Sequence, residues 1–65
     1  MRIKDEISIN TNEIVYAIKK ENVLHNNIIV YSIYIEFKTT SRNIDYGEDE
    51  EGRNKIFDII DRYLI

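Results

Sequence analysis

The sequence predicts an α+β fold: a small antiparallel β-meander of three to four strands with one C-terminal α-helix packed on one face. Three observations lead to this prediction. Residues 28–38 alternate between apolar and other side chains, polar clusters separate them from shorter alternating segments, and the last residues return to apolar character at helical spacing. A sheet and a helix that each bury one side form two layers, so we expect residues 1–65 to make a single domain.

The longest alternating stretch runs from Ile28 to Lys38. Its odd-numbered residues are apolar without a break: Ile29, Tyr31, Ile33, Ile35 and Phe37. Its even-numbered residues begin apolar and end charged: Ile28, Val30, Ser32, Tyr34, Glu36 and Lys38. β-branched and aromatic residues at period two indicate a strand whose odd-numbered side is buried.

Shorter segments supply the other strands. We expect a first strand at Glu6–Ile9 and a last one at Arg42–Tyr46. Residues 13–20 are ambiguous, because Asn10 and Glu13 have the spacing of a capping box and would begin a short helix. Their β-branched and aromatic side chains favour a strand, but the helix stays open as an alternative.

A connection is expected between this segment and the long strand, at residues 21–27. Asn26 and Asn27 turn the chain there, because asparagine tolerates positive φ. Val23 and Leu24 are apolar residues within the connection, and we expect them to pack beneath the sheet edge.

The C-terminal segment is the clearest helix. Gly47 ends the last strand, Asp49 is the expected N-cap, and acidic residues in the first turn suit the positive end of the helix dipole. Gly52 in that turn suggests a close approach to the sheet. The apolar stripe consists of Ile56, Phe57, Ile59, Ile60, Tyr63 and Leu64, with Asp58, Asp61 and Arg62 on the other side.

Composition limits the possible functions. The chain has no cysteine and one histidine, which excludes disulfides and argues against a zinc site, and we expect no cofactor. Its net charge of −3 argues against nucleic acid as the default partner. We expect no membrane contact and a cytoplasmic location, because no long apolar run or signal-peptide core is present. The abundance of Ile, Asn, Lys and Tyr, which have A/T-rich codons, suggests a bacterial or phage genome.

One sheet face remains uncovered in this arrangement. The helix covers the odd-numbered side of the long strand, so the even-numbered side presents Ile28, Val30, Ser32 and Tyr34. An uncovered apolar patch usually marks an interface, and a chain of this size commonly needs a partner subunit for stability. We therefore expect a homodimer, formed sheet to sheet or edge to edge.

The acidic residues Glu48, Asp49, Glu50 and Glu51 form a second candidate site, for binding another protein. Two alternatives are a hard-cation site that includes Asp45 and a mimic of the DNA backbone that also uses Asp58 and Asp61. The spacing does not match a calcium-binding EF-hand loop.

Aromatic and basic residues interleave along the predicted sheet, which suggests another alternative: a single-stranded nucleic-acid binder that uses Tyr34, Lys38 and Arg42. No catalytic or phosphate-binding motif occurs, and we expect His25 to be a solvated loop residue. The leading interpretation is a non-enzymatic protein-binding module that acts as a homodimer and inhibits or modulates another protein.

Overall fold

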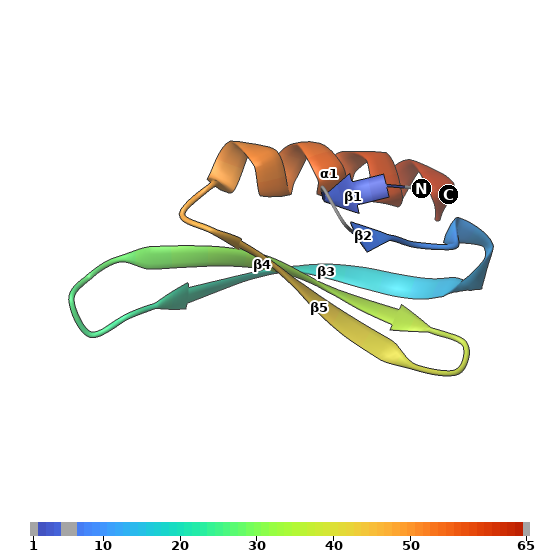
Figure 1. The fold of residues 1–65 in the computed structure, drawn as a ribbon, viewed down its shortest axis with the longest axis horizontal. Coiled ribbons are helices and arrows are strands. Elements are labelled where there is room, and N and C mark those ends of the chain that lie inside the picture. Colours follow the sequence, from blue (N-terminus) through green and yellow to red (C-terminus); the bar gives the residue numbers. More distant parts are fainter. Residues whose placement is uncertain (1, 5–6, 65) are drawn as a thin grey trace.

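The α+β prediction is confirmed by the computed structural model, which describes residues 2–4 and 7–64. The main sheet has three antiparallel strands in the order β3 (Ile14–Val23), β4 (Ile29–Phe37) and β5 (Ser41–Gly47). One helix, α1 (Glu50–Tyr63), packs against it. Before the sheet, β1 (Arg2–Lys4) pairs with β2 (Ile7–Ser8), and a 3₁₀ turn at Thr11–Glu13 leads into β3. Figure 1 shows α1, β1 and β2 on the same side of the main sheet.

The core lies between α1 and the helix-facing side of the sheet. Every buried apolar side chain among the described residues is an isoleucine: Ile9, Ile14, Ile33, Ile35, Ile44 and Ile60. Ile33 and Ile44 are direct cross-strand partners and so share a face, and Ile60 comes from α1. The predicted alternation of the long strand is therefore confirmed at its centre, where Ile33 and Ile35 are fully buried.

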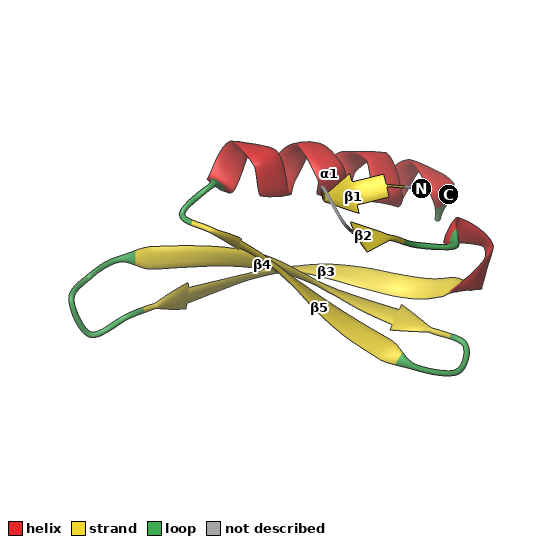
Figure 2. Ribbon diagram, in the orientation of Figure 1, coloured by secondary structure: helices red, strands yellow, loops and turns green. Residues whose placement is uncertain are grey.

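Of the ambiguous residues 13–20, residues 14–20 are a strand, as favoured, and Glu13 ends the preceding 3₁₀ turn. The strand is also longer than predicted. β3 continues through Val23, so the predicted connection over residues 21–27 is wrong in its first half. The loop turns at Asn27, whose φ of 65° is the left-handed conformation expected of asparagine. Figure 2 shows the loop between β3 and β4 extending beyond the end of α1.

Three burial predictions are wrong at the end of the β3–β4 hairpin, which extends past α1. Val23 is 63 % exposed, Leu24 is 37 % exposed and Ile29 is 40 % exposed, although we expected the first two beneath the sheet edge and the third in the core. The alternation does place Ile29 on the helix-facing side, but α1 begins too far along the sheet to cover it.

The helix begins as predicted. Asp49 is the N-cap, and its carboxylate accepts a hydrogen bond from the Gly52 amide at 2.9 Å. The suggested approach of Gly52 to the sheet is wrong, because a Cβ there would meet the Asp49 side chain instead. Tyr63 also differs from the prediction: it is 60 % exposed, whereas the rest of the apolar stripe is buried or half-buried.

Within the described residues, no helix is both long and apolar enough to cross a membrane. α1 has 14 residues, or about 21 Å at 1.5 Å per residue, which is shorter than a bilayer core.

Candidate functional site

The sheet face opposite α1 is the candidate site, and we call it the open face. Directly paired residues on neighbouring strands share a face, so the register defines its members. They are Tyr16, Ile18, Lys20 and Asn22 from β3, Val30, Ser32, Tyr34 and Glu36 from β4, and Ser41, Asn43 and Asp45 from β5. None of the described elements lies over this face in Figure 1.

Three of the four predicted interface residues belong to the open face. Val30, Ser32 and Tyr34 lie on β4 and are half-buried. Ile28 lies just before β4 in the loop, where its backbone carbonyl accepts a hydrogen bond from the Leu24 amide at 2.8 Å. The structure therefore groups the three strand residues and places Ile28 at the base of the loop.

Two further apolar side chains on the open face were not among the predicted interface residues. Tyr16 is 42 % exposed and Ile18 is 47 % exposed, both on β3. Regular alternation would place Ile14, Tyr16 and Ile18 on one side of a strand, but the register shifts between Ile14 and Tyr16. This irregularity leaves Ile14 in the core and the other two on the open face, and no sequence signal marked it.

Tyr34 lies at the centre of the open face. Its ring centroid is 6.1 Å from that of Tyr16, and the Lys20 ammonium lies 5.8 Å from the Tyr34 centroid. The Tyr34 hydroxyl donates a hydrogen bond of 2.6 Å to Oε1 of Glu36. These contacts hold Tyr34 against its neighbours at the centre of a face that combines apolar and polar side chains.

The Glu36 hydrogen bond also affects ionisation. It raises the pKa of Tyr34 above the ordinary value of 10.0, since an ionised Tyr34 could not donate this bond and would repel the carboxylate. Burial adds to the increase in pKa, whereas a hydrogen bond with Ser41 opposes it.

Charge on the open face is mixed. Lys20 contributes one positive charge, whereas Glu36 and Asp45 contribute two negative charges. A surface that binds nucleic acid would show excess positive charge. The open face is therefore better suited to protein than to a phosphate backbone.

The residues of the nucleic-acid alternative do not form one surface. Arg42 is the direct partner of Ile35, which is fully buried under α1, so Arg42 and Tyr34 lie on opposite faces of the sheet. Lys38 follows β4 in the loop, where its amide donates to the Glu13 carbonyl at 3.0 Å.

The acidic residues lie at the start of α1. Glu48, Asp49, Glu50 and Glu51 are all exposed, and Asp49 is occupied as the N-cap. Glu50 and Glu21 contribute, after burial, to raising the pKa of Tyr31. In the described part of the chain, no three His, Cys, Asp or Glu side chains gather closely enough to hold a metal ion.

Arg53 is a structural residue that the sequence analysis missed. It is 2 % exposed and is the one buried charged side chain among the described residues. Its guanidinium donates to the Lys20 carbonyl at 2.8 Å and to the Glu21 carboxylate at 3.3 Å, and lies 5.0 Å from the Tyr31 ring centroid. Its position, three residues before Ile56 and seven before Ile60, matches the apolar stripe and could have indicated its burial.

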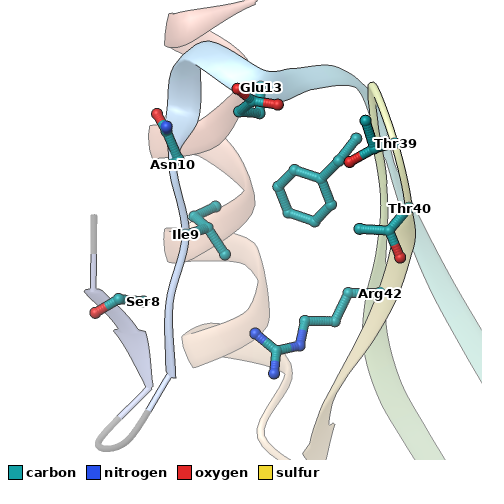
Figure 3. Close-up of a pocket in the computed structure, with 8 residues that line it drawn as sticks. Ser8, Ile9, Asn10, Glu13, Thr39, Thr40 and Arg42 are labelled. Carbon is teal, nitrogen blue, oxygen red and sulfur yellow. The ribbon is translucent and has the colours of Figure 1, made fainter.

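A shallow pocket lies at the other end of the molecule, between the segment after β2 and the β4–β5 hairpin. Its volume is about 220 Å³, and it is lined by Ser8, Ile9, Asn10, Glu13, Phe37, Thr39, Thr40 and Arg42. Figure 3 shows Arg42 extending across it toward the Ile9 segment. Ligand pockets usually occupy about 300–1,000 Å³, so this hollow is small for a substrate site.

His25 is exposed in the loop between β3 and β4, as predicted. Comparisons of the chain with protein-family models, with curated proteins and with solved structures found no match. The open face is therefore the feature of the molecule that best indicates its function.

Proposed function

We propose that this protein is a non-enzymatic protein-binding module that pairs with a second copy of itself through the open face. The observation that supports this proposal is the apolar centre of that face. Tyr16 and Ile18 are 42 % and 47 % exposed beside half-buried Tyr34 and Val30, on a face that no described element covers. Contiguous exposed apolar side chains are a feature of protein–protein interaction sites.

The size of the patch predicts a weak dimer. Fully burying a large apolar side chain contributes about 1.5–3 kcal/mol, so burying the exposed halves of Tyr16 and Ile18 contributes on the order of 1 kcal/mol each. Two copies supply these side chains twice, against an association cost of at least about 4 kcal/mol. These side chains by themselves only offset the association cost, so the net affinity depends on the remaining contacts of the open face. We therefore expect a dissociation constant that approaches the millimolar range.

Stacking of open faces is favoured over pairing through the β3 edge. β3 is an edge strand of the three-stranded sheet and carries the consecutive lysines Lys19 and Lys20. Charged residues on an edge, lysine above all, discourage the pairing of another strand. The Lys20 carbonyl also accepts a hydrogen bond from Arg53.

The acidic start of α1 is the proposed contact for a different protein, which the module would inhibit or modulate. Glu48, Glu50 and Glu51 are exposed, and they lie beyond the end of the last strand, away from the centre of the open face. Both contacts can therefore form at once.

Sedimentation velocity of matched variants tests the homodimer. Ile18→Thr and Val23→Thr each replace an exposed β-branched residue of β3, but Val23 pairs with Ile29 and lies outside the open face. Because both copies lose apolar contact, we expect Ile18→Thr to raise the dissociation constant about tenfold or more. The Val23→Thr control should match the wild-type protein. A wild-type monomer throughout the concentration range, or equal effects of the two substitutions, would contradict the proposal.

A further inference from the structure

Three complete cross-strand rows make up most of the open face, and Asn22 and Val30 form a fourth, two-membered row nearest the β3–β4 loop. Reading across β3, β4 and β5, the first row is Tyr16, Glu36 and Ser41, the second is Ile18, Tyr34 and Asn43, and the third is Lys20, Ser32 and Asp45. The second row is the most apolar of the three. The two outer rows carry the charges and the serine hydroxyls.

We infer that two copies stack antiparallel, related by a two-fold axis that crosses the strands at the row of Tyr34. This inference rests on the proposed homodimer and specifies its geometry. A two-fold axis perpendicular to the sheets would not bring the same faces together. The axis between two stacked sheets therefore runs either across the strands or along them. These two choices give different contacts.

The axis across the strands brings matching side chains together. The row of Tyr34 meets its own copy, so Ile18 lies on Ile18, Tyr34 on Tyr34 and Asn43 on Asn43. The third row of each copy meets the first row of the other. Ser32 and Ser41 then offer hydroxyls to the Glu36 and Asp45 carboxylates of the second copy, and the Lys20 ammonium lies over the second copy's Tyr16 ring.

The lysine contact repeats one that already exists within a subunit. Lys20 lies 5.8 Å from the Tyr34 ring centroid, so its ammonium is directed over the aromatic surface that the second copy would extend. Glu36 of the second copy lies beside that Tyr16 in the same row, which adds an opposite charge.

The axis along the strands brings mismatched side chains together. Each β4 residue would then face itself, which sets Glu36 against Glu36 on the central strand. Ile18 would face the Asn43 amide of the second copy. The compensating contacts, between Lys20 and Asp45, involve the two edge strands, where exposed ion pairs contribute little. The axis across the strands is therefore the better match.

The two geometries place the β3–β4 loops differently. Ile29 begins β4 five residues before Tyr34, which is about 17 Å at 3.3 Å per residue, and the loop extends about 8 Å further. With the two-fold axis across the strands, the two loops lie at opposite ends of the dimer, about 50 Å apart. With the two-fold axis along the strands, both loops lie at the same end of the dimer, less than about 30 Å apart.

A spin label at His25 distinguishes these arrangements. The chain has no cysteine, so His25→Cys provides a unique attachment point in an exposed loop. Double electron–electron resonance on the labelled protein should give a distance of about 50 Å. Dilution with unlabelled protein should remove this signal, and Ile18→Thr should weaken it.

Three results would overturn the inference, and they have different consequences. A distance below about 30 Å contradicts the axis across the strands but leaves the homodimer intact. A distance of about 50 Å that persists unchanged in Ile18→Thr shows a contact outside the open face. No intermolecular signal at any concentration removes the homodimer and this geometry together.

Discussion

At the scale of single residues, Tyr34 connects the chemistry of the open face to the stability of the protein. Its hydroxyl donates to Glu36 in the folded state, which raises its pKa above 10.0. A raised pKa means that folding favours the neutral phenol. The resulting stabilisation is fully present below the unfolded-state pKa and is lost as pH rises through the higher folded-state pKa.

This linkage predicts a specific pH dependence. Between pH 9 and pH 11, the free energy of unfolding should fall less in Tyr34→Phe than in the wild-type protein, because phenylalanine cannot ionise. Tyr31 and Tyr46 also have raised pKa values, so part of the fall should remain. Urea unfolding at several pH values measures this fall in the free energy of unfolding.

Tyr63→Phe is the matched control, because Tyr63 is 60 % exposed at the end of α1. Its pH dependence should resemble that of the wild-type protein. If Tyr34→Phe and the wild-type protein lose stability equally, the hydrogen bond to Glu36 does not influence folding.

At the scale of elements, Arg53 joins α1 to β3. The bond to the Lys20 carbonyl is short and largely shielded from water, whereas the ion pair to Glu21 is longer and its acidic partner is 56 % exposed. Exposed ion pairs contribute about 0–1 kcal/mol, but leaving a buried hydrogen-bonding group unpaired costs about 1–3 kcal/mol. The carbonyl contact should therefore contribute more than the ion pair.

Two substitutions separate these contributions. Arg53→Met keeps much of the side-chain volume but removes every hydrogen bond of the guanidinium, so the free energy of unfolding should fall by about 1–3 kcal/mol. Glu21→Gln removes only the charge and should cost less than about 1 kcal/mol. Urea denaturation compares them, and a larger loss in Glu21→Gln would show that the ion pair dominates.

The elements also show what the sequence could predict. Strict alternation identified the buried side of β4 at Ile33 and Ile35, and the spacing of acidic and apolar residues identified Asp49 as the cap of α1. These features depend on local periodicity and capping, which a sequence carries directly. The fold class followed from them.

The missed features depend on how the elements are aligned. The irregularity after Ile14 turns Tyr16 and Ile18 to the open face, and the length of α1 decides that Val23 and Ile29 stay exposed. Arg53 was overlooked because arginine is rarely buried. Its guanidinium donates a hydrogen bond to a backbone carbonyl of β3, and no sequence pattern indicates that contact. Of the candidate site, the sequence predicted the β4 part and missed the parts from β3 and β5.

At the scale of the whole molecule, the protein has two layers, and the helix covers one face of the sheet. The helix and an isoleucine core complete the inner layer, and the open face is the outer surface of the sheet. Small domains bury a limited fraction of their surface, so a second copy would add the apolar burial that one chain lacks. We therefore expect self-association through the open face.

Dilution followed by two-dimensional NMR tests this claim most directly. Amide chemical shifts of ¹⁵N-labelled protein are recorded from about 1 mM down to about 10 µM, which spans the weak affinity expected. We expect concentration-dependent shifts to concentrate at Tyr16, Ile18, Ser32, Tyr34 and Asn43, while the exposed outer side of α1 at Asp58 and Asp61 stays constant. Shifts confined to α1 or the β3–β4 loop, or no change at any residue, would contradict it.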